Sequence, residues 1–213
     1  MYRTSSILLC AVASSCFALD HVRVNFGQDP TRSAVISFSS NTSNPTSSFV
    51  TYSTSKFTGC GSSSSSSTAT TVSASAFDNS YANSAGLQVV YEAFLNDLSP
   101  STTYFYTACI GADEISPLYS FTTIGKGNSI PKVCYWGDLG RDGGGQAWPF
   151  LEIEANRTAA REPGSCDLGI QNGDFAYDLG DQKGARGAAF MSRFSGISAQ
   201  LPTFTTIGEL DGN

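Results

Sequence analysis

Two short motifs in the second half of the chain have residue types and spacing suited to metal chemistry. They are Gly137-Asp138-Leu139-Gly140 and Gly173-Asp174-Phe175-Ala176-Tyr177. Each follows a short apolar run, and 36 residues separate Asp138 from Asp174. This spacing predicts a strand, a helical segment and a second strand, with one aspartate at the tip of each strand. Ligands bind at that edge of an open α/β sheet. Because two neighbouring carboxylates repel each other, we expect a cation between them, with the Tyr177 phenol as a further oxygen donor.

A simpler interpretation exists for each motif alone. A Gly-Asp pair after a strand also forms ordinary turns, because Gly tolerates positive φ and Asp bonds to its own backbone. Two such pairs after buried-type strands, with a tyrosine three residues after the second aspartate, favour the metal site. Trp136, directly before Gly137, is expected in the core or in a pocket wall.

The sequence pattern from residue 132 onward predicts an α/β fold. Pro149 suits the first position of a helix, and Pro163-Gly164 ends that helix. A second helix is expected from about Gly187, because four apolar residues share one of its faces. A third strand is expected over residues 202–207, ending at Gly208. The four residues on the helix face are Phe190, Phe194, Ile197 and Leu201.

The region before residue 125 has a different pattern, in which β-branched and aromatic residues alternate with polar ones between turn residues. Period-two alternation of this kind predicts an all-β sandwich. The segment 125–131 is expected to be the linker to the α/β part. The expected strands cover residues 21–26, 34–38, 49–52, 87–94, 103–108 and 118–122.

The two Gly-Asp motifs resemble the first and second blocks of the metallophosphoesterases, and the tyrosine resembles that of the purple acid phosphatases. The resemblance implies a centre of iron plus a second divalent metal (zinc, manganese or iron) that hydrolyses phosphomonoesters. Asp138 would be a terminal iron ligand, Asp174 the bridge between the metals, and Tyr177 a phenolate on the iron. Residues 95–106 resemble part of a fibronectin-III-like module, which precedes the catalytic domain in many members of this family. The implied organisation is a sandwich over residues 19–124 followed by the first half of a metallophosphoesterase domain over residues 132–213.

The chain departs from the family pattern at the third strand. Where the resemblance implies an Asn ligand followed by His, the sequence has Glu209 and Leu210. Glu209 offers an oxygen ligand, whereas Leu210 cannot replace a histidine. The two later histidine-bearing blocks do not follow before Asn213, and His21 is the single histidine, expected on the surface of the β part. We therefore expect this chain to be inactive alone. The alternative is a non-catalytic secreted protein with an interacting β-sandwich and an inert α/β remnant.

Composition and targeting signals narrow the class of protein. The net charge of −6 and a pI near 4.6 argue against nucleic-acid binding, and no segment is long enough for a membrane span. Residues 1–18 resemble a signal peptide cleaved after Ala18, so secretion is expected.

An oxidising compartment allows cysteine pairing and glycosylation. Beyond residue 18, the cysteines are Cys60, Cys109, Cys134 and Cys166, which permit three pairings. Cys134 also suits a strand as a small hydrophobic residue. Glycosylation sequons start at Asn41 and Asn156. The sequence leaves the oligomeric state open.

Overall fold

The computed structural model describes residues 19–41, 47–61, 64–65, 67–77, 88–127, 130–140, 147–175, 179–206 and 208. Within these residues it is mostly β-sheet with few helices. The expected signal peptide lies outside them. In the described part of the chain, no helix is long and apolar enough to cross a membrane.

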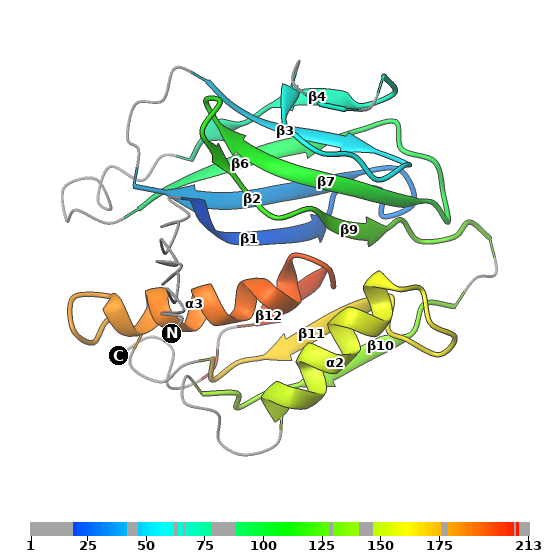
Figure 1. Ribbon diagram of the computed structural model, residues 1–213. Helices are drawn as coiled ribbons and strands as arrows, with labels where there is room; N and C mark the ends of the chain where they lie inside the picture. Colours follow the sequence, from blue (N-terminus) through cyan, green and yellow to red (C-terminus); the bar gives the residue numbers. More distant parts are fainter. Residues whose placement is uncertain are drawn as a thin grey trace, which may run out of the picture.

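Nine strands form two antiparallel sheets that pack face to face, and we call residues 19–124 the sandwich (Figure 1). The first sheet has the order β1-β2-β6-β5; the second has the order β4-β3-β7-β8, and β9 also pairs with β7. Apolar residues alternate along the strands, so their inward faces form one shared core that includes Val24, Ile36 and Tyr106. The strands are β1 (Leu19–Phe26), β2 (Ala34–Ser40), β3 (Ser48–Ser53), β4 (Thr70–Ser73), β5 (Ser75–Ala76), β6 (Val89–Leu95), β7 (Thr103–Ile110), β8 (Glu114–Ile115) and β9 (Tyr119–Thr122).

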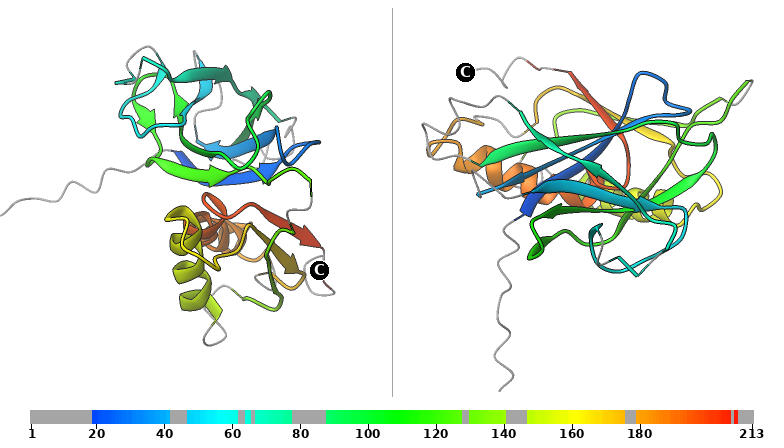
Figure 2. Two further views of the ribbon diagram at one scale, coloured as in Figure 1. Left: turned by 90° about the vertical axis from the view of Figure 1, so that its right-hand side faces the viewer. Right: turned by 90° about the horizontal axis from the view of Figure 1, so that it is seen from above.

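Residues 130–208 form a second part, which we call the parallel unit. Its elements run β10 (Val133–Trp136), α2 (Ala147–Ala159), β11 (Leu168–Asn172), α3 (Ala185–Ser198) and β12 (Thr203–Thr206). The three strands are parallel in the order β10-β11-β12. In Figure 2 both helices lie on one side of this sheet. The helix face expected from the sequence is buried there, with Phe190, Phe194, Ile197 and Leu201 in a second core.

The opposite face of the parallel sheet is apolar and largely exposed. Val133, Tyr135 and Phe204 point to that face and are 48%, 66% and 49% exposed. Parallel strands are normally covered on both faces. The parallel unit therefore has a helix-covered face and an open apolar face within the described residues.

Helix α3 joins the two parts, because it lies along the outer face of β1 (Figure 1). Hydrogen bonds run from β1 and β7 of the sandwich to residues on or just after α3. They join the Tyr106 hydroxyl to the Ala199 carbonyl (2.7 Å), the Ser192 hydroxyl to Asp20 Oδ2 (2.6 Å), the Ser198 hydroxyl to the Val22 carbonyl (3.4 Å) and His21 Nε2 to the Ala188 carbonyl (3.1 Å).

Both disulfides now have defined partners. Cys60 pairs with Cys109 inside the sandwich, and Cys134 pairs with Cys166 in the parallel unit. The interpretation of Cys134 as an unpaired hydrophobic residue is therefore wrong. The reason is that Cys166 ends the loop after α2 beside β10, where the two Cα atoms are 5.7 Å apart.

Candidate metal centre at the strand ends

The structure places Asp138 and Asp174 at the same edge of the parallel sheet. Asp138 is the second residue after β10, and Asp174 is the second residue after β11. The register that pairs Trp136 with Gln171 aligns the ends of these adjacent strands. The juxtaposition expected from the spacing of the two Gly-Asp motifs is therefore present.

Backbone hydrogen bonds tie the two aspartate loops together. The Asp138 N–H donates to the Gly173 carbonyl (3.3 Å), and the Leu139 N–H donates to the Asp174 carbonyl (3.1 Å). Asp138 and Asp174 both have left-handed backbones, with φ of 57° and 50°. Asp tolerates this region better than most residues, and such outliers cluster at functional sites. The paired loops thus carry two aspartates with similar left-handed φ angles.

Two glycines allow the ends of neighbouring strands to lie in close contact at this edge of the sheet. A Cβ on Gly137 would lie 2.9 Å from the Asn172 carbonyl oxygen of the neighbouring strand. A Cβ on Gly208 would overlap Asp174 at its backbone nitrogen and Oδ1. Gly208 follows β12, the third strand expected from the sequence, so the end of this strand meets the second aspartate.

Hydrogen bonds from the buried side chains of Trp148 and Gln171 fix the two aspartate loops. The Trp148 indole N–H donates to the Gly140 carbonyl (2.9 Å), which fixes the first loop. The buried Gln171 accepts a hydrogen bond from the Trp136 indole and donates to the Gly173 carbonyl (3.1 Å), which fixes the second. Buried amides that satisfy their partners specify one local conformation.

Sequence reasoning missed the role of Gln171. The available signal was an amide that directly follows the apolar run of β11, in a strand that packs under helices. The expectation for Trp136 is confirmed, because its ring packs against the second core and lies over Gly169.

The donor chemistry at this edge fits a hard cation. Asp138 is exposed and Asp174 is partly buried, so at least one carboxylate is open to solvent. Carboxylate oxygens suit hard divalent and trivalent cations. The other two expected ligands, Tyr177 and Glu209, lie outside the described residues. The described part of the site therefore consists of two oxygen-donor side chains on neighbouring loops.

A different cluster of side chains with metal-ligand atoms lies between β10, α2 and the loop that follows α2. Cys134, Glu154 and Cys166 have ligand atoms within 4.8 Å of one another. The two sulfurs are bonded to each other, and Glu154 accepts hydrogen bonds from the Cys166 N–H (2.6 Å) and from Arg157 (2.7 Å). This group is therefore a structural cross-link in the oxidised chain.

The expectation that His21 lies on the surface is wrong. Its side chain is only 14% exposed and lies between β1 and α3, where Nδ1 meets the Ser39 hydroxyl (2.8 Å). A bulge in β1 and a φ of 53° turn the ring toward α3. Burial lowers the pKa of His21, while the nearby Asp20 carboxylate opposes this shift. The single histidine thus serves the contact between the two parts of the chain.

Comparisons with known proteins connect this architecture to one family. The family model described as the purple acid phosphatase N-terminal domain matches residues 19–123. Acid phosphatase type 7 of Danio rerio is 32% identical over 120 residues, which cover 56% of this chain and 25% of that protein. The Homo sapiens protein of the same name is 32% identical over 121 residues, covering 56% of this chain and 26% of its own.

A solved structure extends the likeness in fold. Purple acid phosphatase PPD1 from yellow lupin (Lupinus luteus) seeds superposes with a TM-score of 0.66 and 16% sequence identity, covering 90% of this chain and 35% of that one. At this identity the likeness concerns the fold. The chain spans about a quarter of the length of the curated relatives that it matches.

Proposed function

We propose that this chain, which belongs to the purple acid phosphatase family, contributes to the hydrolysis of phosphomonoesters at a dinuclear metal centre. The observation that carries the proposal is the pair of hydrogen-bonded loops that set Asp138 and Asp174 side by side at the strand ends. The family normally carries a dinuclear metal centre. Neighbouring carboxylates at the ligand-binding edge of a parallel sheet are suited to hold one.

Each proposed ligand has a distinct part in binding the metals. Asp138 would hold the iron, and Asp174 would bridge the iron and a second divalent metal, which is zinc, manganese or iron. Tyr177 and Glu209 would add oxygen donors to the same shell. When bound, two such cations supply charge neutralisation and Lewis acidity toward a phosphate ester. The chain's own contribution is to fix both carboxylates through the loop hydrogen bonds and through Gln171 and Trp148.

The proposal also covers the domains of the chain and the secretion of the protein. We propose that residues 19–124 are a fibronectin-III-like module, that residues 132–213 belong to a metallophosphoesterase domain, and that the protein is secreted. Two disulfides favour an oxidising compartment, consistent with the signal-peptide pattern at residues 1–18. Asn41 and Asn156 are both exposed, as glycosylation at these sequons requires.

A non-catalytic role is the second candidate, and the position of His21 favours it. The chain has one histidine, and that side chain is engaged between β1 and α3. Leu210 stands where the family pattern has a histidine. A chain that offers oxygen ligands without imidazole would bind a cation and turn over little substrate. In this candidate the sandwich makes the interactions of a secreted protein.

Metal titration tests the proposed centre. We expect Mn²⁺ to bind the chain weakly in isothermal titration, and Asp174→Asn to abolish that binding. Asp113→Asn removes the same charge from an exposed position in the sandwich and should leave binding unchanged. Gly208→Ala should weaken binding tenfold or more, because its Cβ displaces the Asp174 carboxylate. Equal Mn²⁺ affinity in Asp174→Asn and the unchanged chain would contradict the proposal.

A hydrolysis assay tests whether this chain forms a working centre by itself. With an aryl phosphate, from acidic to neutral pH and with iron, zinc or manganese added, we expect no turnover above background from this chain. Multiple turnovers that disappear in Asp174→Asn would instead assign a working centre to it and exclude the non-catalytic role.

A further inference from the structure

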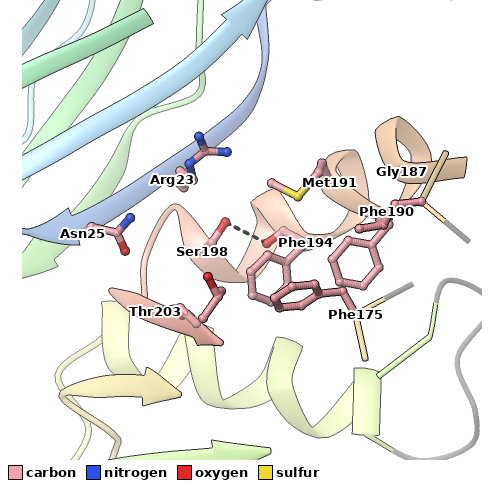
Figure 3. Close-up of a pocket in the computed structure, with 11 residues that line it drawn as sticks. Arg23, Asn25, Phe175, Gly187, Phe190, Met191, Phe194, Ser198 and Thr203 are labelled. Atoms are coloured by element: carbon pink, nitrogen blue, oxygen red, sulfur yellow. Dashed lines mark hydrogen bonds between the residues drawn. The ribbon is translucent and has the colours of Figure 1, made fainter. Parts of the chain in front are cut away.

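A cavity of about 400 Å³ lies between the sandwich and the parallel unit, and Phe175, directly after Asp174, belongs to its lining. Strand β1 forms one side, α3 forms the other, and β12 and Phe175 close it. Figure 3 shows Arg23 and Asn25 on β1, with the phenylalanine rings of the parallel unit on the other side of the cavity. Its volume falls in the range of small-molecule sites. The aspartates of the proposed metal centre are not among its lining residues.

One wall of the cavity is apolar and rigid. It consists of Phe175, Leu179, Phe190, Met191 and Phe194. The Phe190 and Phe194 rings stack with centroids 5.6 Å apart, and Phe175 packs at 6.3 Å from Phe190. Because the rings pack against one another, this wall keeps its shape without a ligand. It can bury an apolar chain or ring.

The facing wall is polar and carries a single charge. Arg23 is the one ionisable residue that lines the cavity in the described part of the chain, and Asn25, Thr203 and Thr205 add hydrogen-bonding groups. Partial burial lowers the pKa of the Arg23 guanidinium, and Glu92 on β6 opposes that shift. A guanidinium remains charged when buried, and its attraction for an anion is stronger in this less polar setting.

Side chains alternate between the two faces of β1, which explains why a charged side chain lies at this interface. Val22 and Val24 point into the sandwich core, so Arg23 and Asn25 must point outward, toward α3. Here a cationic side chain faces an aromatic wall across an open volume.

We propose that this cavity binds a small amphipathic anion, with its apolar body against the phenylalanine wall and its carboxylate at Arg23 and Asn25. At about 30 Å³ for each heavy atom, the share of a water molecule in the liquid, the cavity holds about 13 heavy atoms. A medium-chain carboxylate such as decanoate matches that size. Neither Asp138 nor Asp174 lines the cavity, so this proposal does not rest on the proposed metal centre.

Calorimetric titration of the chain with decanoate, kept below its micelle concentration, tests the proposal. We expect saturable binding with one ligand per chain. Arg23→Gln should weaken it tenfold or more, and Met191→Trp, which fills the cavity, should abolish it. Arg32→Gln makes the same change at an exposed arginine of the sandwich that pairs with Asp97, and should leave affinity within twofold. Absent binding, or equal affinity in Arg23→Gln, would overturn the proposal.

A second measurement locates the ligand without relying on those variants. The sequence has two methionines, Met1 and Met191, so ¹³C-methyl labelling of methionine gives at most two signals. Met191→Leu, a volume-conserving change, assigns the Met191 signal by its loss. Saturating decanoate should shift that signal. Binding that leaves it unmoved would place decanoate elsewhere, such as on the open face of the parallel sheet, and would overturn the proposal.

Discussion

Replacing Tyr106 by phenylalanine should weaken the coupling between the sandwich and the parallel unit. The fully buried Tyr106 hydroxyl, on β7, donates to the Ala199 carbonyl at the end of α3 (2.7 Å). Burial raises the pKa of this phenol well above its usual value of about 10, so it remains a donor at every working pH. Carbonyls at helix ends lack partners within the helix, and this hydroxyl supplies one.

The expected loss of stability follows from the burial of both partners. Tyr106→Phe removes one oxygen atom and leaves the ring packing against Tyr119 and Phe121 in place. The net worth of a hydrogen bond is ~0.5–1.5 kcal/mol, and a buried group left without a partner costs ~1–3 kcal/mol. Water cannot readily replace the hydroxyl, because Ala199 is also fully buried. We expect the free energy of unfolding to fall by about 2 kcal/mol.

Urea unfolding followed by tryptophan fluorescence measures this loss in the part of the chain that does not carry the mutation. Trp136 and Trp148 are the two tryptophans, and both lie in the parallel unit. Tyr135→Phe, an exposed tyrosine on the open sheet face, is the matched control and should change stability by less than ~0.5 kcal/mol. An unfolding midpoint equal to that of the unchanged chain would refute the idea that this bond couples the two parts.

Two further predictions concern the site and the interface. Gln171→Leu leaves the Trp136 indole and the Gly173 carbonyl without their partner. The free energy of unfolding, measured by thermal unfolding, should therefore fall by about 2 kcal/mol or more. A fall below ~0.5 kcal/mol would mean that both groups find other partners. Because the folded pKa of His21 lies below its ordinary value of 6.5, neutral His21 contributes stability that is present above that value and is lost as pH falls through the folded pKa. Urea midpoints should therefore fall less steeply below pH 6.5 in His21→Gln than in the unchanged chain, and parallel pH profiles would contradict this.

The sequence predicts the strands and helices well where the pattern is local. Alternation placed the strands over residues 21–26, 34–38 and 103–108, and the structure has strands over these ranges. The Gly-Asp motifs predicted two strand ends at one edge, because a βαβ connection aligns parallel strands. The ligand roles of Tyr177 and Glu209 stay predictions, since both lie outside the described residues.

The interface could not be predicted from the same patterns. Alternation shows that one face of β1 is apolar, but it does not show what covers the other face. That cover is α3, more than 150 residues later in the sequence. Hence His21 was expected on the surface, whereas its side chain lies in the contact with α3. Arg23, on the same face of β1, lines the cavity. Long-range packing decides the role of the polar face of an edge strand, and a single sequence carries no local signal for it.

The two parts of the chain differ in how they obtain their stability, which is why the α3 interface matters. The sandwich buries the inner faces of both its sheets in its own core. Among the described residues, the parallel unit buries the helix-covered face of its sheet and leaves Val133, Tyr135 and Phe204 exposed. Parallel sheets are normally covered on both faces. Contacts of α3 with β1 and Tyr106 therefore stabilise the parallel unit, and with it the loops that carry Asp138 and Asp174. A mutation at the interface, far from both carboxylates, should consequently be felt at the candidate metal centre.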